Sequence, residues 1–246
     1  MFTGKLSAIL WSGLVILAVT VCTSLGFWQL ERADQKQQRQ QMLDAWSERG
    51  VLSFADAMRF VQQGDATGLQ VRLSGEVHPQ YWLLDNQVYE GKVGYDVIAL
   101  ILPQGSSHWL VTNLGFVRAP TLRTELPNVT LPSTITLPQA LIKQGELGSI
   151  TLDNDIIDPL AASGWPKRIQ QIDITAMVEQ TRKPIHAFMA YAQKPNDVVA
   201  AIPHYQPVTM TAQKHHAYAL QWFLIAFAAV VIALSAYWRA RRTHEE

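Results

Sequence analysis

Two long segments of this chain contain no charged side chain, one near each end. No Asp, Glu, Lys or Arg occurs from Leu6 to Leu30 or from His215 to Trp238. Each segment is longer than the roughly 20 apolar residues that a helix needs to cross a bilayer, so we predict transmembrane helices over residues 6–30 and 215–238. A cleaved signal peptide is the alternative for the first segment, but its apolar core would be shorter, about 7–15 residues, and a small-residue cleavage site would follow.

The short flanks of these segments predict their orientation. The flanking charges are basic: Lys5 before the first segment, and Arg239, Arg241 and Arg242 after the second. Basic flanks stay in the cytoplasm, so we expect both termini, including a tail over residues 239–246, to be cytoplasmic and residues 31–214 to be periplasmic. Few residues precede the first helix, too few for an Arg-rich transit peptide. We therefore expect a multi-pass protein of a bacterial inner (plasma) membrane, with membrane lipid as a partner.

The hydrophobic period changes within residues 31–214. Residues 33–49 are polar with apolar positions at helical spacing, which predicts a solvated amphipathic helix. A second short helix begins at Ser53, a capping residue with Asp56 three residues later. From Leu69 onward apolar and polar residues alternate with the period of two that is typical of strands. Apolar runs that predict further antiparallel strands follow at residues 81–84, 95–102 and 109–117.

Turn-forming residues separate the predicted strands. His78-Pro79 and the segment from Glu90 to Gly94 are expected to be connections, and Gly115 inside a strand predicts a bulge or a close backbone approach. Residues 120–138, rich in Pro, Thr and Ser, are expected to form an exposed loop that leads to an edge strand. The other predicted elements are strands over residues 149–152, 168–172 and 185–191 and a helix over residues 175–181.

The predicted fold class is a membrane protein in which a two-helix transmembrane hairpin carries one extracytoplasmic β-rich α+β domain. This domain is expected to be a small antiparallel barrel or a curled sheet of roughly seven strands. The formal net charge is zero, and the absence of a basic patch or an RNA-binding motif argues against a nucleic-acid partner. There is no Gly-rich phosphate loop, no Gly-x-Ser-x-Gly elbow and no Cys-x-x-Cys pair. No nucleophile has a base nearby in the sequence, so we do not expect an enzyme.

Four residues occur in reversed order where the two predicted membrane helices reach the same bilayer face. The first helix ends Phe27-Trp28-Gln29-Leu30, and the second contains Leu220-Gln221-Trp222-Phe223 near its start. In an antiparallel pair, this reversal places Trp28 level with Trp222 and Gln29 level with Gln221. Polar residues within a membrane need a partner, and Gln29 is the nearest one for Gln221. An ordinary interfacial aromatic belt explains the tryptophans equally well.

The second membrane helix has a regular stripe that predicts how it packs. Small residues and one tryptophan recur at alternating spacings of three and four: Ala219, Trp222, Ala226, Ala229, Ala233 and Ala236. Membrane helices associate through small residues, so this seam should meet the first helix. The small residues expected opposite the seam are Ala8, Ser12, Cys22 and Gly26.

The adjacent histidines His215 and His216 are the best candidate ligand site in the sequence. His215 lies four residues before Ala219 and is in phase with the seam, whereas His216 is rotated by about 100°. With Tyr218 one turn away, a planar apolar ligand could lie against the rings and take an imidazole nitrogen. The alternative is that both histidines are interfacial residues solvated by lipid headgroups.

Other groups of polar residues carry weaker hypotheses. Three carboxylates resemble a calcium loop only in charge, without its glycine and final glutamate, and are expected to be solvated: Asp153, Asp155 and Asp158. Four histidines are scattered without metal-ligand spacing and are expected to have surface or core roles: His78, His108, His186 and His204.

Two motifs, one at each membrane helix, are specific enough to compare with a known family. Residues 26–32 read Gly-Phe-Trp-Gln-Leu-Glu-Arg and residues 215–223 read His-His-Ala-Tyr-Ala-Leu-Gln-Trp-Phe. They match the Gly-x-Trp-Gln-x-x-Arg and His-x-x-Tyr-x-x-x-Trp-[Phe/Tyr] motifs of the Surfeit locus protein 1 family, and the chain resembles that family over nearly its whole length. Its strand motifs resemble residues 83–86, 94–97 and 111–117. The departures are Leu114 and Gln87 in place of arginines and Arg118 in place of a proline.

The resemblance implies a cytochrome c oxidase assembly factor that holds or guides haem a for insertion into oxidase subunit I at the outer face of the membrane. Subunit I and other oxidase assembly or haem a synthesis proteins would be its partners. The family's haem-related role carries to His215, as ligand of the haem iron, and to Tyr218, Trp222, Trp28 and Gln29. The alternative function is a cofactor-free membrane scaffold that stabilises an oxidase assembly intermediate.

Overall fold

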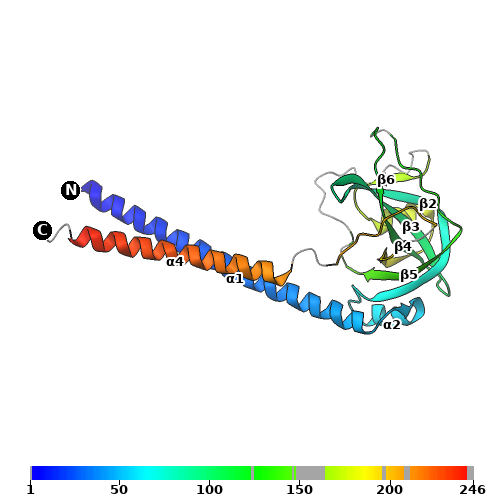
Figure 1. The fold of residues 1–246 in the computed structure, drawn as a ribbon, viewed down its shortest axis with the longest axis horizontal. Coiled ribbons are helices and arrows are strands. Elements are labelled where there is room, and N and C mark those ends of the chain that lie inside the picture. Colours follow the sequence, from blue (N-terminus) through cyan, green and yellow to red (C-terminus); the bar gives the residue numbers. More distant parts are fainter. Residues whose placement is uncertain are drawn as a thin grey trace. The chain divides into compact units, whose positions relative to one another are not determined.

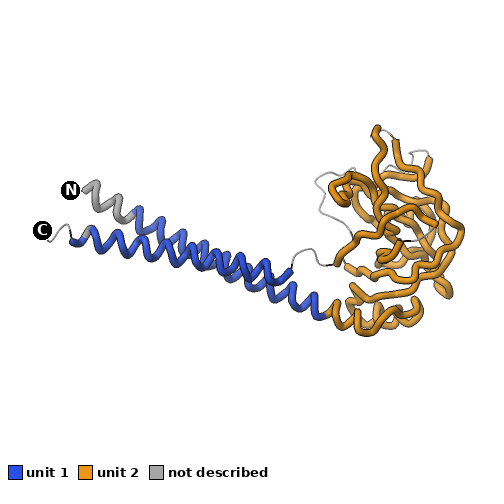
Figure 2. The backbone as a smooth tube through the Cα atoms, viewed as in Figure 1, with its two compact units in different colours: residues 1–41, 208–246 blue, residues 42–207 orange. Residues whose placement is uncertain are grey.

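The computed structural model describes residues 2–122, 125–145, 147, 164–195, 198–207 and 211–242. The chain divides into two compact units, residues 1–41 with 208–246 and residues 42–207 (Figure 2). The predicted strand over residues 149–152 and the carboxylates Asp153, Asp155 and Asp158 lie outside the described residues.

The first unit is a pair of long helices that lie side by side and antiparallel (Figure 1). They are α1 (Phe2–Glu48) and α4 (Ala212–Arg242). Both are long and apolar enough to cross a membrane, and only 6% and 11% of their most apolar windows are buried inside the protein. A core helix of a soluble protein would be mostly buried, so this exposure agrees with two helices that offer their side chains to lipid.

Helix α1 continues far beyond its apolar segment. The predicted amphipathic helix over residues 33–49 is the last part of α1, with no break after Leu30. Residues 31–48 contain no glycine or proline and are rich in Gln, Glu, Arg and Ala, which favour helix. The helix stops before Gly50, which has a φ of +69° and a backbone N–H that donates to the Ser47 carbonyl at 3.0 Å. Within the second unit, Trp46 near this end packs edge-to-face on Phe60, with ring centroids 5.5 Å apart.

The second unit is rich in strands and follows the predicted order of elements closely. Its elements are β1 (Leu52–Ser53), α2 (Phe54–Gln63), β2 (Gln70–Tyr89), β3 (Lys92–Pro103), β4 (Trp109–Arg118), β5 (Thr134–Lys143), β6 (Lys167–Ile169), α3 (Ile174–Thr181) and β7 (Ile185–Ala192). The predicted cap of α2 is confirmed, because the Ser53 hydroxyl oxygen accepts a hydrogen bond from the Asp56 backbone N–H at 3.1 Å. Helix α3 ends at Arg182, which has left-handed backbone angles.

The seven strands form one curled sheet in which the series of paired strands closes on itself. Neighbours run β2–β3–β4–β7–β5, and β5 also pairs with β2. The pairs β2–β3, β3–β4, β2–β5 and β5–β7 are antiparallel, whereas β4–β7 is parallel and the short β1 and β6 pair parallel with β2. The expectation of an edge strand after the proline-rich loop was wrong, because β5 has a partner on each side.

Two prolines that were expected in connections lie inside strands instead. The predicted turn at His78-Pro79 is part of β2, and the register of β2 against β3 shifts between Val77 and Tyr81. Pro138 lies in β5 at another shift, opposite Arg72. A bulge leaves residues unpaired, so the N–H that proline lacks is not missed there. The predicted connection from Glu90 to Gly94 is shorter than expected. Only Glu90 and Gly91 form the hairpin loop, with φ angles of +48° and +73°, and residues 92–94 belong to β3.

Both faces of the central strands are buried, which explains their nearly continuous apolar sequences. Along β3, Val97, Ala99 and Ile101 belong to the larger core cluster, whereas Ile98 and Leu100 belong to a second cluster on the opposite face. Helix α3 covers the second cluster with Met177, which is completely buried. The indole N–H of the buried Trp82 donates to the Gln180 side chain at 2.7 Å.

Candidate functional site

The predicted seam is confirmed along most of α4. Ala219 and Ala226 are buried, and Trp222, Ala229 and Ala233 are partly buried. Ala236 is exposed, so the seam ends one turn earlier than predicted. On α1, the buried and partly buried residues include a stripe at spacings of four and three: Val15, Val19, Cys22, Gly26, Gln29 and Ala33. Ser12 is exposed, so it is not one of them, and the side chain of Ala8 lies outside the described part of the chain.

The two helices approach each other closely at Gly26. A Cβ added there would lie 2.5 Å from a ring carbon of Phe223, so no larger residue fits unless that ring moves. The Phe223 ring also meets Phe27 edge-to-face, with centroids 5.4 Å apart and planes at 73°. This pairing has the register that the reversed sequences predict. In the part of the chain that the structure describes, the two phenylalanines rather than Trp28 and Trp222 form the ring contact across the pair.

A hydrogen bond joins the two predicted polar positions His215 and Gln29. The distance from His215 Nδ1 to Gln29 Oε1 is 2.8 Å. The expected pairing of Gln29 with Gln221 was wrong, because Gln221 is exposed and the position opposite Gln29 is taken by the imidazole. His216 is exposed, as its phase predicts.

The bond to Gln29 determines which nitrogen of His215 is available. An amide oxygen can only accept, so Nδ1 donates, and in the neutral imidazole Nε2 is then the nitrogen that carries the lone pair. Nε2 is buried and has no hydrogen-bond partner among the described residues. A buried polar atom without a partner is costly and uncommon. Metal-ligating histidines have this arrangement, with one nitrogen held by an acceptor and the other directed at the metal, so the site fits an iron ligand.

The aromatic residues of the predicted site differ in their exposure. Trp28 and Tyr218 are 46% and 47% exposed, while Trp222 is partly buried in the seam. The guanidinium of Arg32 lies over the Trp28 ring, 5.5 Å from its centroid. About half of each of Trp28 and Tyr218 is therefore exposed, and the cation of Arg32 covers one face of the Trp28 ring.

A second polar cluster, which the sequence did not predict, is buried in the β-rich unit around Asp96. One carboxylate oxygen of Asp96 accepts from Asn113 Nδ2 at 2.7 Å, and the other lies 2.7 Å from His204 Nε2. The amide oxygen of Asn113 accepts from the Gly115 backbone N–H at 2.8 Å. Burial, reinforced by Tyr205 and Asp96, raises the pKa of the nearby Tyr191, whose ring stacks on Tyr205 at 3.7 Å.

Residues 198–207, which we call the strap, are attached to strand β3 through His204 and Asp96 and to strand β4 through Ile202. The strap residue Ile202 exchanges two backbone hydrogen bonds with Phe116, at 2.8 and 2.9 Å. Both predictions for Gly115 are confirmed: it has a φ of +122°, and a Cβ there would lie 2.4 Å from the backbone carbon of Ile202. Because the bonds of Asp96 and Asn113 join β3, β4 and the strap, we interpret the cluster as structural.

Two more of the scattered histidines, His108 and His186, lie close together, with ring centroids 5.3 Å apart. The Ser106 hydroxyl is 3.1 Å from His186 Nε2 and also bonds to the His108 carbonyl at 2.9 Å. Burial and the neighbouring His108 lower the pKa of His186 to about 4. A base with so low a pKa activates a serine poorly at neutral pH. No group of three metal-binding side chains occurs among the described residues.

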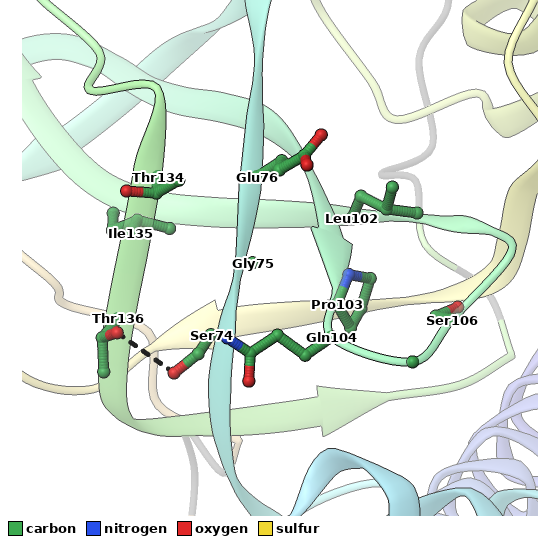
Figure 3. Close-up of a pocket in the computed structure, with 11 residues that line it drawn as sticks. Ser74, Gly75, Glu76, Leu102, Pro103, Gln104, Ser106, Thr134, Ile135 and Thr136 are labelled. Atoms are coloured by element: carbon green, nitrogen blue, oxygen red, sulfur yellow. Dashed lines mark hydrogen bonds between the residues drawn. The ribbon is translucent and has the colours of Figure 1, made fainter.

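A depression of about 550 Å³ crosses β2, β3 and β5 on the outer surface of the sheet (Figure 3). Its lining is mainly hydroxyl and amide groups, and Ser74 and Thr136 are hydrogen-bonded across it at 3.1 Å. Glu76 is its one titratable lining residue among those described. Nothing in this lining resembles an activated nucleophile or a metal site.

The comparisons with known proteins agree with the motifs at the membrane helices. The model of the SURF1 family matches residues 16–227, which include the β-rich unit and a large part of each long helix. The chain therefore belongs to the SURF1 family of cytochrome c oxidase assembly factors. No curated protein matches the chain.

The structure explains two departures from the family pattern. Leu114, in place of an arginine, has no partner in β3 at the bulge and packs in the larger core with 4% exposure. Gln87, also in place of an arginine, donates from its side chain to the Asp85 carbonyl at 2.8 Å. Both residues therefore serve local structure within the β-rich unit.

Proposed function

We propose that this chain is a non-enzymatic chaperone that holds or guides haem a during assembly of cytochrome c oxidase, with His215 as ligand of the haem iron. Membership of the SURF1 family supports the role in oxidase assembly. The observation that carries the ligand assignment is the buried Nε2 of His215, which has no partner among the described residues while Nδ1 is held by Gln29.

The residues around His215 fit the chemistry of haem. The exposed parts of Trp28 and Tyr218 offer contact to a flat apolar ring, and Arg32, which lies over the Trp28 ring, offers a cation to the haem carboxylates. Bound haem would supply an iron centre that takes an axial imidazole. Because Nε2 is buried, the His215 ring or a side chain that covers it must move before this nitrogen can bind a metal.

The proposed location is the bacterial inner membrane, with both termini cytoplasmic and residues 31–214 periplasmic. The basic residues at the end of α4 support this orientation. Oxidase subunit I and the proteins that make haem a are the partners that this location and the family role favour.

The test uses the full chain, purified in detergent after co-expression with haem a synthesis. We expect wild-type protein to carry haem, His215→Ala to lose or shift its absorbance spectrum, and His216→Ala to retain it, because only His215 faces the seam. Gln29→Leu should weaken retention less than His215→Ala, since loss of a residue that orients a ligand typically costs about 10- to 100-fold in metal affinity.

Two results would count against this assignment. Equal losses in His215→Ala and His216→Ala would mean that the orientation of the helix does not select the ligand. Full haem content in the double variant would favour the cofactor-free scaffold, in which the helix pair and the β-rich unit stabilise an oxidase assembly intermediate.

A further inference from the structure

The last turns of α4 carry a groove whose lining changes from apolar at one end to basic at the other, and which has no part in the haem proposal. Its volume is about 440 Å³, and its lining residues are Val231, Leu234, Ser235, Trp238, Arg239 and Arg242. At four-residue spacing they form two parallel ridges, Val231-Ser235-Arg239 and Leu234-Trp238-Arg242. Both ridges change in the same order, from an aliphatic side chain, through a hydroxyl or an indole, to a guanidinium.

This change from apolar to basic side chains matches the order of acyl chain, ester and phosphate in a phospholipid. From Val231 to Arg242 the helix rises about 16 Å. An acyl chain fits the aliphatic end, an ester region fits the hydroxyl and the indole N–H, and a phosphate fits two guanidinium groups. Inorganic phosphate alone would leave the apolar half of the groove without a function. We propose that this groove binds one anionic phospholipid.

The groove also lies on the side of α4 opposite its seam, which is the side expected to face lipid. At about 100° per residue, its centre lies roughly opposite the seam of Ala219, Trp222, Ala226, Ala229 and Ala233. Val231, Leu234 and Trp238 are 44%, 55% and 65% exposed. The helix C-terminus itself carries partial negative charge and repels an anion, so the arginines must supply the attraction.

A neighbouring arginine provides a matched control for the experiment. Arg241 is rotated by about 90° from the centre of the groove, and its guanidinium lies over the Tyr237 ring at 5.6 Å. Arg241→Gln and Arg242→Gln therefore remove the same charge from adjacent positions, and only Arg242 lines the groove.

The experiment measures lipid retained by the full chain, using native mass spectrometry after exchange into detergent with equal phosphatidylglycerol and phosphatidylcholine. We expect wild-type protein to retain one phosphatidylglycerol. Arg242→Gln should weaken retention roughly fivefold, and Arg239→Gln with Arg242→Gln roughly 25-fold. Arg241→Gln should retain the lipid. Ser235→Phe, which fills the groove without changing charge, should also lose it.

Three results would overturn the proposal. Equal weakening by Arg241→Gln and Arg242→Gln would mean general attraction of basic residues to an anionic surface. Equal retention of phosphatidylcholine would mean that the net negative charge of the lipid is not recognised. Displacement of the lipid by inorganic phosphate at constant ionic strength would mean that the anion alone is bound. Circular dichroism of each variant checks that α4 is intact, and haem content reports separately on the His215 site.

Discussion

Replacement of Gly115 by alanine tests the strongest steric constraint in the β-rich unit. Gly115 has a φ of +122°, and the three atoms nearest to an added Cβ all belong to the backbone of Ile202 and Pro203, at 2.4 to 2.6 Å. Backbone atoms cannot rotate out of the way as a side chain can. A methyl group at this position must therefore push the strap away from β4.

The expected cost has two parts. A non-glycine residue held in such a backbone conformation costs about 1–3 kcal/mol. Displacement of Ile202 also loses its two backbone hydrogen bonds with Phe116, each contributing about 1 kcal/mol net. Together these terms predict a loss of about 3–5 kcal/mol, and the melting temperature of a domain of this size should fall by roughly 10 °C.

The assay is thermal unfolding of the full chain in detergent, followed through the circular dichroism of the strands. Gly105→Ala is the matched control, because Gly105 has a φ of +78° and nothing within 4 Å of an added Cβ, so it should cost only about 1–2 kcal/mol. Limited proteolysis should cut the strap faster in Gly115→Ala than in the control. Equal melting temperatures for the two variants would refute the steric argument.

Three further outcomes are expected. Cysteines introduced at positions 29 and 215 in a Cys22→Ser background should form a disulfide, and Gly26→Ile should reduce its yield because a side chain at 26 meets Phe223. Adding Phe223→Ala should restore the yield. Gly13→Ile should have no effect, because nothing lies within 4 Å of a Cβ at Gly13. The folded-state pKa of His186 is about 4, below the ordinary value of 6.5, so the unfolded chain takes up the proton first and stability is lost as the pH falls from 6.5 towards 4. His186→Phe should therefore make the melting temperatures at about pH 7.5 and pH 5 more alike. The same change at the exposed His216 should not. A reporter that is active only outside the cytoplasm should work when fused after Gly148 and fail when fused after Glu246, and the opposite pattern would reverse the proposed orientation.

The sequence was most informative where one residue pattern repeats over many positions. The charge-free segments predicted both long helices, and the three-and-four spacing of alanines in α4 predicted which of its faces meets α1. The period of two predicted the start of β2, and apolar runs predicted the rest of β2, β3 and β4. The phase of His215 against Ala219 predicted that it, and not His216, is turned towards the partner helix.

The errors arose where tertiary pairing overrides local preference. Pro79 and Pro138 are turn formers in isolation, but bulges in β2 and β5 accommodate them within strands. The bond from His215 to Gln29 could not be predicted by matching reversed residues, because that match considered only identical side chains. The Asp96, Asn113 and His204 cluster joins residues up to 108 positions apart, and no spacing rule connects them.

The position of β7 in the sheet has a consequence for how the protein is made. Strand β7 pairs with both β4 and β5, so neither strand has all its neighbours until residue 192 has been synthesised. Pairings between distant segments form slowly, and the first residue of α4 follows only 20 positions later. A chain cut short before β7 would therefore expose the edges of two strands, and we expect it to be cleared by proteases as a misfolded domain even if its first membrane helix inserts correctly.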